Sequence, residues 1–312
     1  MSIRCRPGMD HPHYDYSPIV ERPSLKWPDG ARVAVMVIIN LEHMEWRPPE
    51  GSYQPPSLTA GIVGGSGGTR PFPDYSRFSH REYGHRVGVF RLLAMLKRHN
   101  IPATIAMDAL TAKHYPYLVR HCLEQGCEII GHGISASRMI TSRMSEDEER
   151  RYIKESLEAL KKAAGQSPNG WFGPEYGESQ RTPSLLAEAG VRYVCDWAND
   201  EQPYAMKVSK GQLYALPIAF ELDDVNAMFV RTVPITRYVK MVKDTFDVLY
   251  KDSAASGRLL VINLRPWFSG QPFRARLLDQ AFAHIASRRG VWAATGSRIV
   301  DWFRGQDSSR RR

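Results

Sequence analysis

The chain has 312 residues, 43% of them hydrophobic and 24% charged, which is typical of a globular protein and unlike a disordered or fibrous one. Its formal net charge is +9, but the C-terminal Arg-Arg-Arg supplies three of these charges, and the other basic residues are not interleaved with aromatics as in a nucleic-acid groove. No apolar run approaches the roughly 20 residues of a membrane-spanning helix, the N-terminus lacks the apolar core of a signal peptide, and the four cysteines form no CxxC pair. We expect a cytoplasmic protein with free thiols that binds neither nucleic acid nor membranes.

Residues 1–30 contain prolines, histidines and aromatics without periodicity, which predicts an extended N-terminal arm lying over the body or over a neighbouring subunit. Residues 33–39 are seven consecutive apolar residues, so they predict a strand buried on both faces, as in a parallel sheet or barrel. Glu42 and His43 follow this strand at its carboxyl end, where α/β folds hold their ligands. The pattern predicts an active site here, with an acidic surface turn as the alternative.

Segment 47–79 is rich in proline and glycine, and a structureless stretch of this length predicts a lid loop. The first helix is expected to start at Ser79, which has capping-box spacing to Glu82, and a later one at Ser145, with Glu148 in the same relation. Apolar spacing predicts further strands at 103–107, 128–131, 170–174, 193–196, 213–218, 259–264 and 291–294, and further helices at 117–125, 183–189, 236–250 and 274–287.

Strands and helices alternate without a break in composition, which predicts a single parallel α/β domain over 31–304, closed as a barrel rather than an open sheet, followed by a disordered basic tail at 305–312. Polar residues recur just past the strand ends, and a barrel would gather them in one mouth. They are Glu42, His43, Asp108, His132, Glu175, Asp196, Asp200, Glu221, Asp223, Asp224 and Arg265.

Several segments resemble the polysaccharide deacetylases of carbohydrate esterase family 4, whose domain is also called the NodB homology domain. The residues that carry the resemblance are 25–28, 40–42, 128–133, 170–174, 196–197, 199–204 and 270–274. The resemblance covers about 25–303 and is closest to the branch with allantoinase-like and cyclic-imide-hydrolysing proteins. It implies an incomplete (β/α)7-type barrel that hydrolyses non-peptide carbon–nitrogen bonds. In the metal-dependent members an Asp and two His hold a divalent cation, and another Asp acts as base.

The chain departs from the family pattern at three places. The family's Asp-Asp pair is Glu42-His43, the second metal histidine is Ala136, and the histidine after the seventh strand is Arg265. The resemblance therefore puts Glu42 in the base position and offers His43 and His132 as metal ligands. A catalytic zinc wants three protein ligands, and Glu175 would have to supply the third. We expect no cofactor, with a zinc-like divalent metal as the alternative.

Amide hydrolysis needs an activated water, a stabilised oxyanion and an acid for the leaving nitrogen. Glu42 is the expected general base if burial raises its pKa, and His132 is expected to orient the water or act as acid, unless it is a structural histidine. Arg265 would bind a carboxylate, a ureido group or the oxyanion, or else form a salt bridge to Asp196 or Asp224. The expected substrate-binding residues are Trp171, Glu175, Asp196, Trp197, Asp200, Glu221 and Trp267, although core packing is the default for each tryptophan.

The predicted function is hydrolysis of a small cyclic amide, imide or ureide, with Glu42 as general base. A metal-dependent sugar N-deacetylase and a catalytically degenerate barrel that binds a ligand or partner protein are the alternatives. The expected partner is a small-molecule substrate, and the N-terminal arm suggests a homo-oligomer.

Overall fold

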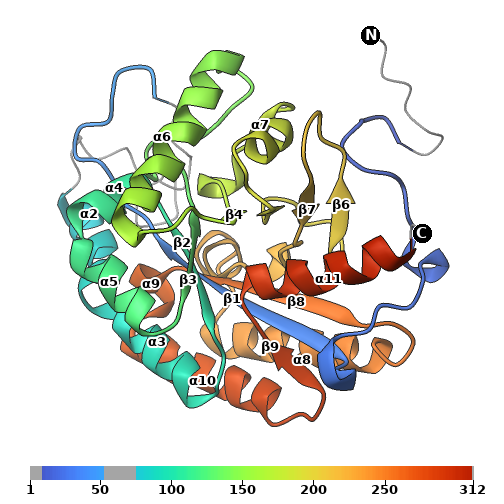
Figure 1. Cartoon of the computed structure of the whole chain (residues 1–312). Coiled ribbons are helices and arrows are strands. Elements are labelled where there is room, and N and C mark those ends of the chain that lie inside the picture. The colour runs from blue at the N-terminus through green and yellow to red at the C-terminus, as the bar shows by residue number, and fades with distance from the viewer. Residues whose placement is uncertain (1–8, 53–74, 311–312) are drawn as a thin grey trace.

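The fold is built on one curled sheet around strand β1 (Val33–Leu41), as Figure 1 shows for the computed structural model, which describes residues 9–52 and 75–310. The strand order is β6-β7-β5-β4-β3-β2-β1-β8, with β9 also paired to β1. The pairs are parallel except β6 with β7. The other strands are β2 (Ala103–Met107), β3 (Glu128–Gly131), β4 (Gly170–Trp171), β5 (Tyr193–Val194), β6 (Tyr204–Met206), β7 (Leu213–Ala215), β8 (Arg258–Leu264) and β9 (Val291–Ala293).

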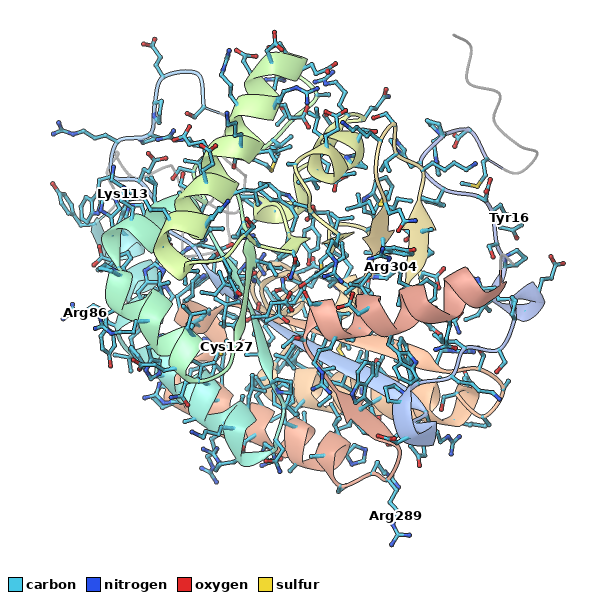
Figure 2. The ribbon with its side chains drawn as sticks, viewed as in Figure 1. Tyr16, Arg86, Lys113, Cys127, Arg289 and Arg304 are labelled. Atoms are coloured by element: carbon cyan, nitrogen blue, oxygen red, sulfur yellow. The ribbon has the colours of Figure 1, made fainter. Side chains whose placement is uncertain are left out.

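Helices surround the sheet (Figure 1). They are α2 (Tyr75–Tyr83), α3 (Val89–Arg98), α4 (Ala109–His114), α5 (Pro116–Glu124), α6 (Glu146–Ala164), α7 (Thr182–Glu188), α8 (Ile235–Asp252), α9 (Pro266–Ser269), α10 (Pro272–Ala286) and α11 (Gly296–Arg310). Short 3-10 turns lie at η1 (Ile19–Glu21), η2 (Pro28–Gly30), η4 (Pro174–Tyr176) and η5 (Phe220–Leu222), and π-helical turns at η3 (Gly84–Gly88) and η6 (Val225–Val230). Charged side chains such as Arg86 on η3 and Arg289 in the turn after α10 project outward from the body (Figure 2).

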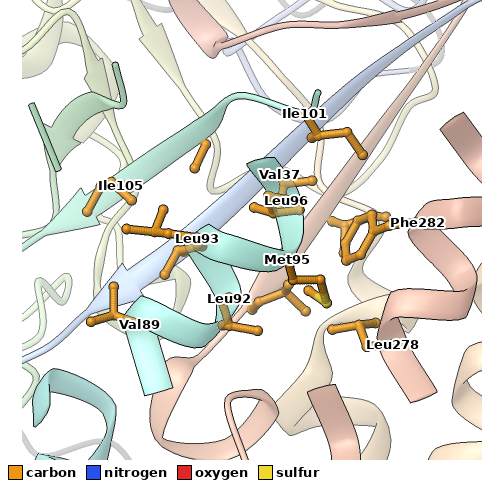
Figure 3. Close-up of a cluster of buried hydrophobic side chains, with 14 of the residues drawn as sticks. Val37, Val89, Leu92, Leu93, Met95, Leu96, Ile101, Ile105, Leu278 and Phe282 are labelled. Carbon is orange, nitrogen blue, oxygen red and sulfur yellow. The ribbon is translucent and has the colours of Figure 1, made fainter. Parts of the chain in front are cut away.

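Strand β1 is buried along its whole length because both of its faces pack, as its unbroken apolar run predicts. Val35 and Val37 belong to the cluster between the sheet and the helices, where Val37 lies among side chains of α3 and α10 (Figure 3). Met36 and Ile38 belong to a second cluster inside the barrel. Since side chains alternate along a strand, the even-numbered residues face the barrel interior.

The predicted incomplete (β/α) barrel is confirmed. The sheet path runs from β6 to β8 without a ladder between these two strands in the described part of the chain. Single backbone hydrogen bonds span the gap, from the Leu259 amide to the Glu201 carbonyl at 2.7 Å and from the Ala219 amide to the Val261 carbonyl at 3.2 Å. Ile299 of α11 packs into the interior cluster, so this helix covers that cluster.

Several element boundaries differ from prediction. Helix α2 begins at Tyr75, and the Ser79 hydroxyl donates to the Ser76 carbonyl inside the helix instead of capping it. The capping box of Ser145 and Glu148 at the start of α6 is confirmed. Residues 305–310 continue helix α11, where a disordered tail was expected. Helix α4, helix α11 and the antiparallel strand β6 were not predicted.

Segment 9–30 of the N-terminal arm lies on the body of its own chain. The Lys207 amide donates to the His13 carbonyl at 2.7 Å, and the Tyr14 ring contacts Trp197 and Tyr204. Most of the expected lid falls on residues 53–74, which lie outside the described residues. Within the described ranges, the helices include none that is both long and apolar enough to cross a membrane.

Candidate active site

Polar residues that follow parallel strands meet at one end of the barrel. Glu42 comes directly after β1 and continues its inward-facing series, His132 follows β3, and Arg265 follows β8. Glu42 Oε1 lies 3.1 Å from His132 Nε2 and 3.7 Å from Arg265 Nε, while its other oxygen, Oε2, lies 3.8 Å from Arg81 Nη1. All four side chains are buried. The three predicted catalytic residues are therefore close together, and Arg81 of α2 joins them.

The His132 imidazole has an acceptor at each ring nitrogen. Its Nδ1 is hydrogen-bonded to the Phe172 carbonyl and its Nε2 to Glu42. Burial alone would lower the pKa of His132. The hydrogen bond to Glu42 and the negative charge of Glu42 together outweigh burial, so the net shift of the pKa is upward. Because a neutral ring could donate from one nitrogen alone, two acceptors favour the doubly protonated imidazolium when Glu42 is ionised.

The pKa of Glu42 moves opposite to the direction that the predicted base role assumed. Burial does raise it, but the hydrogen bond from His132 and the charges of Arg265 and Arg81 outweigh this effect and lower the pKa to about 2. Glu42 is thus a carboxylate at neutral pH. A base with so low a pKa is weak by itself, so Glu42 and His132 are better treated as one coupled unit.

Arg265 is locked in a dense hydrogen-bond network on the β8 side of Glu42. Its Nη1 donates to Asp223 at 2.8 and 2.9 Å, and its backbone amide donates to Asp224 at 2.7 Å. Asn263 and Tyr176 each donate a further hydrogen bond to Asp223, at 2.6 and 2.7 Å. Of the two salt bridges proposed as the alternative role of Arg265, the one to Asp224 is present, at 3.5 Å.

The opposite side of Glu42 borders a small cavity of about 10 Å³, which is room for about one water molecule. Its lining is Glu42, His43, Met44, Phe78, Arg81, Glu82, His85 and Tyr115. Within the described residues, Glu42 Oε2 and His85 Nδ1 are buried here without a hydrogen-bond partner. Ligand pockets usually measure about 300–1,000 Å³, so this space as it stands holds a water molecule and nothing larger.

The residues present do not fit the metal that the family implies. Among residues 9–52 and 75–310, no three His, Cys, Asp or Glu side chains are grouped so as to hold an ion. His43 follows β1 at an outward-facing position, and its ring lies 4.9 Å from His114. Ala136, at the position of the second family histidine, packs with Met44 and Phe78 in an apolar cluster. Both nitrogens of His132 are already engaged.

Most of the predicted substrate-binding residues lie away from the cavity, although the charge of Glu175 acts on both Arg81 and Arg265. Asp200 is paired with Arg22 of the N-terminal arm, and Glu221 is exposed and paired with Arg231. Trp171 is fully buried in the cluster of Ile134 and Leu185, which is core packing. Trp197 contacts the N-terminal arm, Trp267 lies under the Arg81 guanidinium at 4.0 Å, and Glu175 is half-buried in a left-handed backbone conformation.

Asp196 is a buried carboxyl beside the site rather than in the cavity lining. Its Oδ1 accepts a 2.7 Å hydrogen bond from the Gly173 amide. Burial raises the pKa of Asp196 to about 7, and it raises the pKa of the neighbouring Glu178 well above its usual range. Asp108 behaves similarly: burial raises its pKa to about 7, while it caps α4 through Thr111 and accepts the His43 amide. These carboxyls serve as hydrogen-bond acceptors for the backbone around the mouth.

Sequence reasoning missed Arg81 and His85, which reach the cavity from α2 and η3. A signal was present, because the stretch Arg81-x-x-Gly84-His85-x-x-Gly88 places two glycines at a close helical spacing. Such glycines mark a place where a helix backbone approaches another segment closely.

The family model for polysaccharide deacetylase matches residues 82–194. A putative polysaccharide deacetylase of Schizosaccharomyces pombe is 26% identical, over 88% of this chain and 91% of that protein. The solved structure of a probable polysaccharide deacetylase from Pseudomonas aeruginosa is 28% identical with a TM-score of 0.80, covering 91% of this chain and 95% of that one. The structure of PuuE allantoinase is 26% identical with a TM-score of 0.81, covering 94% and 98%. The chain therefore contains a polysaccharide deacetylase domain at residues 82–194, and over about nine-tenths of its length it is similar to proteins named as deacetylases and an allantoinase, which are hydrolases of carbon–nitrogen bonds.

Proposed function

We propose that this protein hydrolyses a carbon–nitrogen bond of a small cyclic amide, imide or ureide, with Glu42 and His132 working as one proton-transferring pair. The observation that carries the proposal is the free Oε2 of Glu42. It is buried, faces the cavity and accepts no hydrogen bond from any described residue, while Oε1 is held by His132. A buried carboxylate oxygen without a partner is costly, and a water molecule or substrate N–H would satisfy it.

The pair can supply each proton transfer that hydrolysis requires. A water on Glu42 Oε2 attacks the carbonyl carbon, forming a carbon–oxygen bond as its proton passes to the pair. The pair then returns a proton to the leaving nitrogen as the carbon–nitrogen bond breaks, so the residues regain their initial protonation. Arg81 lies on the Oε2 side, where its positive charge would stabilise the developing oxyanion.

The chemistry of the cavity lining supports this substrate class. The lining combines Met44, Phe78 and Tyr115 with a few polar groups, which suits a compact planar ring. The allantoinase among the similar structures supports a ring-opening reaction by its name, whereas the relatives named polysaccharide deacetylases support the alternative, a sugar N-deacetylase.

The testing experiment assays the purified protein on five- and six-membered cyclic imides and ureides, with N-acetylated sugars in parallel. We expect turnover of a cyclic compound, and Glu42→Gln should lower kcat about a hundredfold or more while ligand binding persists. The matched control is Glu45→Gln, since Glu45 is three residues away, ion-paired with Arg138 and outside the cavity lining.

Two results would contradict the proposal. Turnover of N-acetylated sugars alone would establish the deacetylase alternative, and binding of cyclic compounds without any turnover would establish the catalytically degenerate barrel. Elemental analysis of the wild type and of His132→Ala accompanies the assay. A near-stoichiometric metal that is lost in the variant would replace the pair mechanism by metal-assisted hydrolysis.

A further inference from the structure

We propose that Asp196 is a positioning residue for His132 and acts on it through one peptide group, the one that joins Phe172 to Gly173. The Asp196 carboxylate accepts the N–H of this peptide, and the C=O of the same peptide accepts the His132 Nδ1–H. The inference rests on the proposed function, because it states what holds and charges the His132 ring that faces Glu42.

The order of the strands brings the three partners side by side. Strands β3, β4 and β5 are consecutive neighbours in the sheet. His132 follows β3, the peptide follows β4, and Asp196 follows β5. Ladder hydrogen bonds continue past the strand ends, since the Phe172 amide donates to the Gly131 carbonyl and the Cys195 amide to the last residue of β4, each at 2.9 Å. The strand register therefore places the peptide between the histidine and the carboxyl group.

Both ends of this peptide are held by hydrogen bonds. The Gly173 amide donates to Asp196 Oδ1 at 2.7 Å, and the Phe172 carbonyl oxygen accepts from His132 Nδ1. The second ring nitrogen of His132, Nε2, lies 3.1 Å from Glu42 Oε1. An unbroken chain of hydrogen bonds thus runs from Asp196 through the peptide and the imidazole to Glu42.

A peptide group can carry the influence of a charge from its N–H to its C=O. Resonance couples its two ends, so an anion that accepts the N–H increases the negative charge on the carbonyl oxygen. The Phe172 oxygen then becomes a stronger acceptor for the Nδ1–H of His132, which favours the imidazolium form of the ring. Without the Asp196 charge the same hydrogen bond would persist with a weaker acceptor.

Glu178 keeps Asp196 in its charged form. Asp196 Oδ2 and Glu178 Oε1 are buried and accept no N–H or hydroxyl donor of the described residues, so a proton shared by the two carboxyl groups satisfies them. Burial and the charge of Asp196 raise the pKa of Glu178 well above its usual range, so Glu178 is the member that donates. Burial raises the pKa of Asp196 to about 7, although the hydrogen bonds from Glu178 and Gly173 oppose this shift. At pH 8 Asp196 is therefore ionised.

The test records the imidazole N–H protons of protein labelled with ¹⁵N-histidine, by NMR at pH 8 and without any ligand. The His132 Nδ1–H is identified by its loss in His132→Gln. We expect Asp196→Asn to move this resonance upfield, because the amide keeps an acceptor for the Gly173 N–H but carries no charge. With a cyclic substrate that is turned over, kcat should fall about tenfold and KM should stay within about twofold, since Asp196 acts on the proton-transferring pair.

Two further variants serve as controls. Glu178→Gln keeps an uncharged donor beside Asp196, so the His132 resonance should stay at its wild-type position. Glu128→Gln removes the charge of a carboxyl at the opposite end of β3, where it accepts the Ser297 amide at 3.0 Å, and it should leave both the resonance and kcat unchanged. Circular dichroism and thermal unfolding verify folding. Asp196→Ser, which also removes the charge, is the second variant if Asp196→Asn does not fold.

The outcomes distinguish this inference from the proposed function. An upfield shift in Asp196→Asn without hydrolysis of any compound would uphold the link through the peptide and overturn the hydrolase proposal. Hydrolysis that depends on Glu42, together with an unmoved His132 resonance in Asp196→Asn, would overturn the link alone. A fall in kcat without a shift of the resonance would also overturn it, because Asp196 would then act on something other than His132. An equal shift in Glu128→Gln would have the same meaning.

Discussion

The two sides of Glu42 are built in opposite ways. On the β8 side, Arg265 is held by Asp223 and Asp224, and Asn40 and Asn263 extend the same network by a 2.7 Å hydrogen bond. On the cavity side, Arg81 makes no hydrogen bond to any described residue, and His85 Nδ1 has no partner there. Both sides present a buried guanidinium to the same carboxylate. Arg265 is paired with two carboxyl groups through Nη1, although its Nε has no hydrogen-bond partner among the described residues, whereas the ion pair of Arg81 is the 3.8 Å contact with Glu42.

This difference separates scaffold from binding surface. A buried ion that is paired with opposite charges fixes the position of its neighbours, and removing it leaves those buried charges without compensation in a low-dielectric interior. A buried polar group without a partner is retained at a cost to stability, which is the usual mark of a functional site. Arg265 therefore positions Glu42, whereas Arg81 and His85, on the cavity side, are proposed to be less important to the scaffold. The predictions below test this division.

The largest expected effect is the loss of stability in Arg265→Met. The substitution leaves the buried carboxyls of Asp223 and Asp224 without their cation, so the free energy of unfolding should fall by about 3–5 kcal/mol. Urea unfolding at neutral pH measures it. The control is Arg22→Met, which breaks a partly exposed ion pair with Asp200 and should cost about 1 kcal/mol or less. Equal losses in both variants would remove the distinction between a scaffold arginine and a surface one.

A smaller effect is expected in the pH dependence of stability on the cavity side. The pKa of His85 is lowered to about 4 in the folded protein, below the ordinary histidine value. As the pH falls below about 6.5, the unfolded chain takes up this proton first, so the free energy of unfolding decreases, by up to about 1.4 kcal/mol per pH unit. In His85→Phe the free energy of unfolding should fall less steeply between pH 6.5 and 4, because unfolding then takes up one proton fewer.

Unfolding curves at pH 7.5, 6.5, 5.5 and 4.5 measure the slope for wild type and variant. Burial likewise lowers the pKa of His43 to about 4, so His43→Phe should flatten the profile further when combined with His85→Phe. Parallel profiles for wild type and His85→Phe would show that His85 does not stay neutral in the fold.

Much of the fold followed from local pattern. The apolar run of β1, the capping box of α6 and the alternation of strands with helices predicted the barrel correctly. Helix α11 was missed because little of its sequence is apolar, and its burial depends on the barrel end that it covers. Strand β6 was missed because a three-residue antiparallel strand carries almost no periodicity of its own.

Some features of the site could be predicted from the sequence, and others could not. Side chains alternate along β1, so Glu42 continues the inward-facing series and His43 does not. This alternation argues against His43 as a metal ligand. The low pKa of Glu42 could not be predicted, because it depends on His132, Arg265 and Arg81 converging from segments far apart in the chain. The role of Arg81 depends on how closely α2 and η3 approach α9, which is a property of tertiary packing.

The smallest expected effect is on the stability of Arg81→Met, and it is the sharpest test of the division. The variant loses the cation–π contact with Trp267 and the attraction to Glu42 Oε2 at 3.8 Å, which together favour the wild type. It also relieves the burial of a guanidinium that has no hydrogen-bond partner in the described part of the chain, which favours the variant. These terms oppose each other, so the free energy of unfolding should change by no more than about 1 kcal/mol. A loss as large as that of Arg265→Met would mean that Arg81 is structural, and the cavity side of Glu42 would then belong to the scaffold as well.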